Sequence, residues 1–207
     1  MSVIPLKELS ESIQLHLEWI KTVGQAGKQL VLDGADLTGI ELLAMDLTDA
    51  SLAAVHFDRA ILRGCTFGGA NLASASFIGA DLAQADFTKA NLNYAVFRNA
   101  SLRGVRGFRT SFVRADFRGA DLTDANLFRA YLKDARLDNA VLRRANLDQA
   151  DLTGAWLAGA SLVGAKSVAT VTAGSLYIGA DRVSMLEGQA ALRWLIGAAS
   201  ASASDIP

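Results

Sequence analysis

Residues 145–162 read ANLDQADLTGAWLAGASL, and the spacing inside this stretch decides the fold. A leucine stands at every fifth position, and an alanine stands two residues before each leucine. A helix with 3.6 residues per turn would carry such a repeat around its whole surface. A flat strand would turn every second leucine to the opposite face of a sheet. Neither element buries this pattern along one stripe.

The same spacing extends from Leu32 to Leu162, where 26 of 27 positions hold Leu or Phe and only Gly107 departs. A second period of twenty appears among the phenylalanines, which recur at 57, 77, 97 and 117 and again at 67 and 87. Four pentapeptides therefore make one turn, so that side chains of one kind stack on each other. The sequence predicts an all-β solenoid of nearly seven coils, joined by parallel β-bridges and filled by Leu, Phe and Ala.

This repeat resembles the pentapeptide-repeat family, whose motif is A-(D/N)-L-x-x, as in ADLAQADFTKANLNYAVF at residues 80–97. The resemblance covers about two-thirds of the chain. It implies a right-handed quadrilateral parallel β-helix. The best understood members of the family bind bacterial DNA gyrase or topoisomerase IV and relieve its poisoning by quinolones or natural-product toxins. Several of them dimerise through their C-terminal ends.

An open coil end exposes core side chains and unpaired backbone, so both ends of the rod need caps. Pro5 suits the first position of a helix, and Gly24 suits its end. Between them one apolar stripe recurs at helical spacing, so a capping helix is predicted over residues 5–23. We expect four regions: an N-terminal helical cap at 1–29, the β-helix at 30–165, a C-terminal strand/helix cap and dimerisation element at 166–200, and a disordered tail at 201–207.

The C-terminal cap contains a second helix signal. Ser184 and Glu187 have the spacing of a capping box, which predicts a helix that begins at Ser184. This helix either closes the rod or pairs with a second copy, and the sequence favours a homodimer because a strand and a helix exceed what one end requires. The predicted dimer-interface residues are Met185, Leu186, Leu192, Trp194, Leu195 and Ile196.

Composition excludes several classes of function. The chain has a formal net charge of −1, one cysteine, no apolar run fit for a signal peptide and none long enough for a membrane span. We therefore expect a cytoplasmic protein. No Cys/His cluster has metal-ligand spacing and no phosphate-binding glycine loop is present. Asp116 and similar acids stand in the turn slot before Leu or Phe. The sequence predicts no enzyme, no catalytic residue, no metal and no cofactor.

The charge is unevenly distributed along the chain. Residues 1–60 carry nine acids and four bases, whereas residues 98–144 carry eleven bases and five acids. The 20-residue turn stacks Lys89, Arg109 and Arg129 into one outward column beside two phenylalanines. Either these residues form an interface, or the Arg stems merely cover the rings. The predicted partner-binding residues are Lys89, Arg103, Arg106, Phe108, Arg109, Phe128, Arg129 and Tyr131.

Gly107 lies in the middle of this basic region and leaves a gap in the column of leucines. One possibility is that the gap is a feature of the site and that Phe108 points outward. The alternative is a local bulge in which Phe108 turns inward to fill the space, since a cavity of this size would cost about 2–4 kcal/mol. The sequence favours the bulge.

Three functions compete. The first is protection of DNA gyrase or topoisomerase IV, although a basic belt does not fit mimicry of DNA along the whole rod. The alternative is a scaffold or regulatory module that binds another acidic protein through the basic and aromatic face. Binding of nucleic acid is the third, and the net charge and the acidic first 60 residues argue against it.

Overall fold

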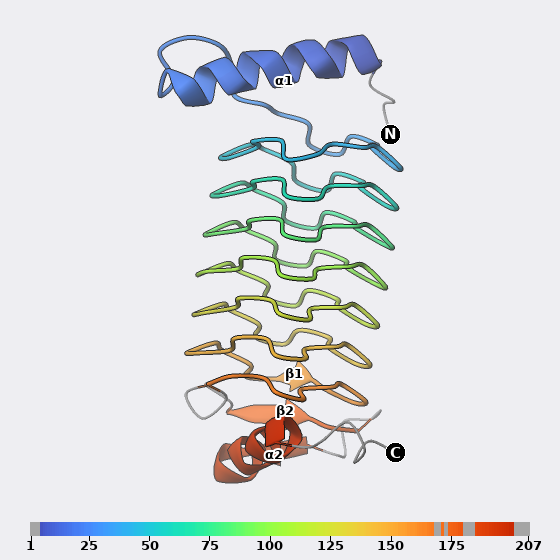
Figure 1. Cartoon of the computed structure of the whole chain (residues 1–207), viewed down its shortest axis with the longest axis vertical. Helices are drawn as coiled ribbons and strands as arrows, with labels where there is room; N and C mark the ends of the chain where they lie inside the picture. Colours follow the sequence, from blue (N-terminus) through green and yellow to red (C-terminus); the bar gives the residue numbers. More distant parts are fainter. Residues whose placement is uncertain (1–4, 168–170, 172–173, 180–184, 201–207) are drawn as a thin grey trace.

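The protein is a rod of stacked coils with a helix across each end (Figure 1). A computed structural model describes residues 5–167, 171, 174–179 and 185–200; the predicted disordered tail lies outside them. Helix α1 precedes the coils, and three short strands and helix α2 follow or close them. Their bounds are α1 Leu6–Lys21, β1 Ala155–Trp156, β2 Ser175–Tyr177, β3 Met185–Glu187 and α2 Gly188–Ser200.

Each coil contains twenty residues, because isolated parallel bridges join residues twenty positions apart, from Val31 with Ser51 to Asn146 with Lys166. Two backbone hydrogen bonds flank a bridge: the Leu32 N–H donates to the Ser51 carbonyl at 2.8 Å, and the Ser51 N–H donates to the Leu30 carbonyl at 2.9 Å. Bridging segments are too short to count as continuous strands. The predicted solenoid of parallel β-bridges with a 20-residue turn is present.

The interior is filled by stacked side chains. Phe97 stacks on Phe77 at 4.9 Å between ring centroids and on Phe117 at 4.8 Å. It also meets Phe87 from the neighbouring column edge to face, at 6.4 Å. All of these rings are fully buried. Offset and edge-to-face pairs add about 0.5–1.5 kcal/mol each beyond the burial of their area, so the rings stabilise the middle of the rod.

The corners of the coils adopt the left-handed backbone conformation. Glycine adopts it without cost, as at Gly69 with φ 67°, whereas Arg109 and Arg129 adopt it with φ 53° and 56°. A Cβ added at Gly69 would collide with the carboxylate of Asp49, which leans over this glycine from the coil before it. The corners therefore stack in columns, as the bridges do.

Gly107 keeps the register of the rod. Its N–H donates to the Asn126 carbonyl at 2.7 Å, as the equivalent residues of the other coils do. A Cβ added here would lie 2.9 Å from Leu127 Cδ2 and 3.4 Å from Phe112 Cε2. The predicted bulge is therefore wrong: Phe112, in a column that otherwise holds leucine, fills the space, and Phe108 stays on the outside.

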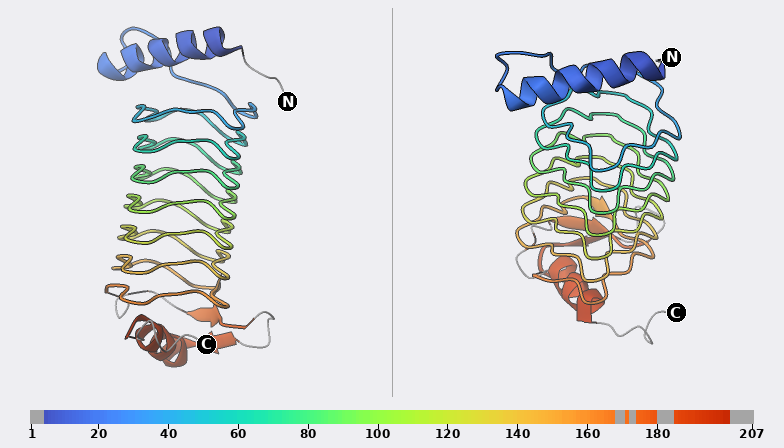
Figure 2. Two further views of the ribbon diagram at one scale, coloured as in Figure 1. Left: turned by 45° about the vertical axis from the view of Figure 1, so that its right-hand side comes forward. Right: turned by 45° about the horizontal axis from the view of Figure 1, so that its top comes forward.

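Helix α1 lies across the first coil and covers its core (Figure 2). Leu9 and Ile13 are buried there, and His16 is fully enclosed. The Leu30 N–H donates to His16 Nδ1 at 3.0 Å, which ties the helix to the coil. Burial lowers the pKa of His16. The helix ends at Lys21, earlier than expected, because Thr22 already caps it.

The C-terminal end adds two strands to the last coil. β2 pairs parallel with β1, with Leu176 opposite Ala155, and β3 pairs antiparallel with β2, with Leu186 opposite Leu176. The predicted capping box is wrong, because Glu187 lies in β3 and α2 begins only at Gly188. Ser184 lies outside the described residues.

Helix α2 packs on the end of the rod and buries Ala191 and Leu195 completely. Leu195 therefore has no surface for a second copy, and its prediction as an interface residue is wrong. Leu186 and Trp194 are partly buried against the core. Met185 and Ile196 are the exposed members of the predicted set, at 38% and 42%.

Candidate functional site

Two phenylalanines and three cations form one outward patch at the middle of the rod. We call Lys89, Phe108, Arg109, Phe128 and Arg129 the Phe108 face. The two rings stack at 5.5 Å between centroids with an interplanar angle of 20°. The Arg109 guanidinium lies 5.3 Å from the Phe108 centroid, and the Arg129 guanidinium lies 5.0 Å from the Phe128 centroid. The 20-residue turn brings these residues together, as the sequence predicts.

The cations of the Phe108 face are not neutralised within it. Arg129 Nε donates to the side-chain oxygen of Gln149 at 2.7 Å. Lys89 and Arg109 form no ion pair with any residue that the structure describes. A guanidinium held flat on a ring still offers the N–H groups of its edge, which match a carboxylate. The face can therefore bind an acidic group that comes from outside.

The flanking residues of the predicted site behave differently. Arg103 pairs with Asp121 at 2.8 Å, and Arg106 pairs with Asp86 at 3.4 Å. Tyr131 lies on the neighbouring face of the rod and is 50% exposed. The structure thus brings five of the eight predicted residues together and leaves these three at the border.

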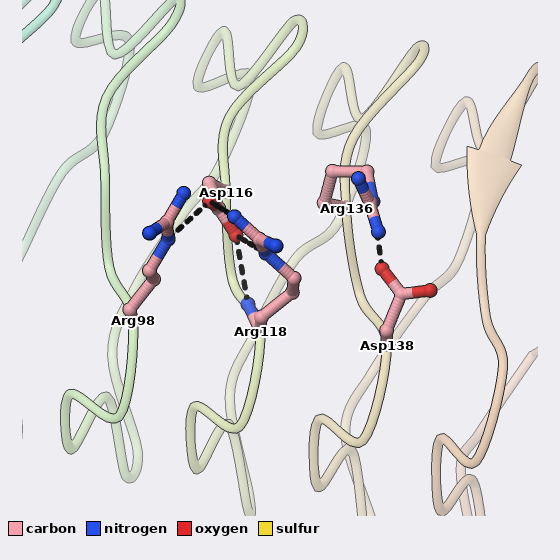
Figure 3. Close-up of polar contacts among 5 residues, drawn as sticks. All are labelled: Arg98, Asp116, Arg118, Arg136 and Asp138. Carbon is pink, nitrogen blue, oxygen red and sulfur yellow. Dashed lines mark hydrogen bonds and ion pairs between the residues drawn. The ribbon is translucent and has the colours of Figure 1, made fainter. Parts of the chain in front are cut away.

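Most other bases of residues 98–144 also have acidic partners. Asp116 forms ion pairs with Arg98 of the preceding coil and with Arg118 of its own coil. One coil further on, Arg136 forms an ion pair with Asp138 (Figure 3). Two more pairs are Arg114 with Asp134 and Arg144 with Asp124. These pairs neutralise most of the bases on the other faces, with Lys133 and Arg143 as exceptions among the described residues. Part of the excess positive charge that the sequence shows is therefore available on the Phe108 face, at Arg109 and Arg129.

The Asp116 ion pairs make a testable contribution to stability. Burial alone would raise the pKa of Asp116, but hydrogen bonds from Arg118 and Arg98 outweigh it and lower the pKa to about 2. A lowered pKa means that the folded state binds the ionised form better, so the stability is present above pH 4 and is lost as the pH falls towards 2.

We expect Asp116→Asn to lower the free energy of unfolding at pH 7 by about 2 kcal/mol and to flatten its decline between pH 5 and pH 2. Urea unfolding across this pH range measures both effects. Asp36→Asn is the matched control, since Asp36 has no cationic partner in an ion pair among the described residues. Equal slopes for wild type and Asp116→Asn would contradict the assignment.

The surface also carries shallow hollows between coils. One of about 530 Å³ lies over Asp124, Arg144 and Lys166. Two of these charges satisfy each other, because Arg144 donates two hydrogen bonds of 2.7 Å to Asp124. Within the described part of the chain, no group of three or more His, Cys, Asp and Glu side chains could hold a metal ion. Nor does any helix described there have the length and apolarity to span a membrane.

Known proteins share the repeat. The family model described as pentapeptide repeats matches in eight copies at residues 31–69, 65–104, 108–127 and 125–164. The matched segments leave out residues 105–107, which include Gly107. No curated protein matches the chain by sequence.

Three solved structures illustrate the likeness. Full-length QnrB1, a plasmid-mediated fluoroquinolone resistance protein, is 22% identical over 75% of this chain and 87% of its own, with a TM-score of 0.39. HetL from the cyanobacterium Nostoc sp., involved in heterocyst differentiation regulation, is 23% identical over 82% of this chain and 77% of its own, with a TM-score of 0.32. A pentapeptide repeat protein from the Arabidopsis thaliana thylakoid lumen is 28% identical over 62% and 68%, with a TM-score of 0.23. None of them carries the assignment of a function to this chain.

Proposed function

Because the chain belongs to the pentapeptide-repeat family, we propose that it is a non-enzymatic, cytoplasmic rod that binds a bacterial type II topoisomerase. Binding protects DNA gyrase or topoisomerase IV from poisons such as quinolones or natural-product inhibitors. The choice of a topoisomerase rests on the family, whose recurrent biochemical activity this is. The choice of the contact surface rests on the residues of this chain.

The Phe108 face is the observation that carries the proposal. Arginine and aromatic residues are enriched at the energetic centres of protein interfaces. Here the stacked rings hold the two guanidinium groups in place, so that little side-chain freedom is lost when a partner binds. Stacked like charges also destabilise the free rod by some tenths of a kcal/mol or more, which an acidic partner would relieve.

The charge of this face points to contact with protein rather than to mimicry of DNA. A surface that imitates DNA must be acidic, whereas Lys89, Arg109 and Arg129 make this one basic. We propose that the face contacts an acidic surface of the topoisomerase. A second contact, in which Met185 and Ile196 of two copies meet at the C-terminal end, would give the homodimer that the family resemblance implies.

A supercoiling and DNA-cleavage assay tests the function. Gyrase is incubated with a quinolone in the presence of wild type, Arg109→Glu/Arg129→Glu or Lys133→Glu/Arg143→Glu. The two variants change the net charge equally, and Lys133 and Arg143 are exposed bases on other faces without ion pairs in the described chain. We expect wild type and the Lys133/Arg143 variant to restore supercoiling, and the Arg109/Arg129 variant to lose at least tenfold in potency.

Two outcomes would count against the proposal. Wild type that has no effect with gyrase and topoisomerase IV across several poisons would remove the topoisomerase as partner. Equal loss in both variants would show that net charge alone matters and that the Phe108 face is not the contact. A partner captured by wild type but not by Arg109→Glu/Arg129→Glu would then identify the scaffold function that is the alternative.

A further inference from the structure

The side of the rod that carries the Phe108 face also carries acids, two to four coils before the residues of this face. Asp46 and Asp49 lie at its N-terminal end and form no ion pair with any described residue. Asp49 is exposed and belongs to the same column of corner residues as Lys89, Arg109 and Arg129. One side of one rod therefore shows unpaired negative charge at one end and unpaired positive charge in the middle.

The size of the outward side chains also changes along this side, from glycine near the acidic end to phenylalanine in the basic middle. Gly68 stands in the outward slot that holds Phe108 and Phe128 two and three coils further on. An added Cβ at Gly68 would lie 3.7 Å from Thr48 Oγ1 and 3.7 Å from the Thr88 carbonyl oxygen. The missing side chain leaves a notch between the two threonines. Gly68 itself has no side chain in this slot that would block a group approaching from outside.

A two-fold axis perpendicular to the rod would bring these features together. Such an axis makes two rods antiparallel and keeps every residue opposite its own column, while the order of coils is inverted. With the axis at the level of Lys89, Phe108 of one copy lies over Gly68 of the other, and Arg129 lies opposite Asp49. Arg109 then lies opposite Gly69, over which the carboxylate of Asp49 leans. Each Asp49 thus lies between two guanidinium groups of the second copy.

We propose that this side of the rod binds a second copy of the chain, antiparallel and side by side. The contact is separate from the end-to-end dimer of the C-terminal helices, and it does not depend on the identity of the topoisomerase. It covers the Phe108 face, so self-association and binding of an acidic partner exclude each other. Wherever the dimer forms, a partner has to displace the second copy before it can bind the Phe108 face.

The small footprint makes the contact weak. Five rungs of about 4.8 Å and three outward residues of about 3.3 Å give roughly 250 Å² of flat surface. Standard interfaces bury about 800 Å² on each partner, so a dissociation constant near 100 μM is expected. Because charges dominate, 0.5 M NaCl should weaken it about tenfold relative to 50 mM NaCl.

Sedimentation equilibrium from 10 μM to 1 mM tests the contact by exchange of charge. Asp49→Lys places an ammonium group against Arg109 and Arg129, and Arg109→Asp/Arg129→Asp places carboxylates against Asp49, so each variant alone should lose at least tenfold in dimer affinity. An equimolar mixture of the two should regain it, because both contacts of the mixed dimer are then complementary. The corner backbone tolerates both changes, since Lys89 and Asp134 adopt the same left-handed conformation.

Lys89 provides a further discriminating variant. The two Lys89 side chains would meet at the axis, so Lys89→Gln should strengthen self-association severalfold, whereas it should weaken binding of an acidic partner. The measurements are repeated with Ile196→Glu, which removes end-to-end pairing from the signal. Wild type that stays monomeric at 1 mM in 50 mM NaCl overturns the proposal. So does a mixture that fails to regain affinity while circular dichroism shows every variant folded.

Discussion

Replacing Phe97 by alanine is expected to lower the free energy of unfolding by about 4 kcal/mol. The reason is its position between stacked neighbours on both sides. Phe97 contacts the rings of Phe77 and Phe117 at 4.9 and 4.8 Å, and it meets Phe112 edge to face at 6.1 Å. The coils above and below hold these rings in place, so the cavity left by the substitution cannot collapse.

The loss should also change how the rod unfolds. In a solenoid each coil contacts only its neighbours, so a weak coil in the middle separates the two halves. Urea unfolding of Phe97→Ala should therefore show a lower slope or two transitions, whereas Phe97→Leu should cost less than about 1.5 kcal/mol and keep one transition. Leucine fills the equivalent slot in other coils, which makes it the matched control. A loss below about 1.5 kcal/mol for the alanine variant would show that the core relaxes around the gap.

Gly107 and Phe112 should compensate each other in a double-mutant cycle. Gly107→Leu alone overpacks the space that Leu127 and Phe112 fill, and should cost about 1–3 kcal/mol. Phe112→Leu alone leaves that space partly empty and should cost roughly 1–2 kcal/mol. The double variant places leucine in both columns, as Leu127 and Leu132 do in the following coil, and should be within about 1 kcal/mol of wild type. The coupling energy is then about 1 kcal/mol or more.

Thermal and urea unfolding of the four proteins measure this cycle. Additive losses would mean that Phe112 does not fill the space beside Gly107. The double variant also answers a functional question, because it regularises the core while Phe108 keeps its outward slot. If the glycine serves only packing, the double variant should protect gyrase as well as wild type does. Loss of protection with full stability would make Gly107 part of the site.

The fold was predictable because the five-residue repeat extends over 27 consecutive positions and determines the structure more strongly than the helix or strand propensity of any single segment. A Leu or Phe at every fifth position has one stable solution, and the 20-residue period of the phenylalanines gives the size of the turn. The error at Gly107 arose from considering its own column alone. Phe112, the single phenylalanine in a column of leucines, was the signal that the neighbouring face supplies the missing volume.

The C-terminal end was less predictable, because the five-residue repeat stops there and only local signals remain. Ser184 and Glu187 match a capping box. Leu186 nevertheless lies in β3, where it pairs with Leu176 of β2 and continues the sheet of the last coil. The free edge of the coil competes for these residues with the local helix signal. Tertiary pairing outweighs the cap, and α2 begins one residue beyond the strand.

The site was predictable only as a set of columns. The period places Lys89, Arg109 and Arg129 above one another, but it does not give the ion pairs between coils. Arg103 and Arg106 were predicted for the site, and Asp121 and Asp86 hold them instead. Such pairs depend on the side-chain rotamers that charged residues of neighbouring coils adopt. The 20-residue period of the sequence gives the column of each residue but not its rotamer.

The 20-residue coil has a consequence for how such a chain changes length over generations. Since every bridge joins a residue to the one twenty positions later, a duplication or deletion of twenty residues preserves all local pairings wherever in the repeats it begins. A change by a multiple of five that is not a multiple of twenty shifts one column onto another, and phenylalanines then face leucine slots. Genes of this kind can therefore grow by whole coils that keep these pairings, and each coil inserted between the acidic end and the basic middle moves the two apart by one fixed increment of about 4.8 Å.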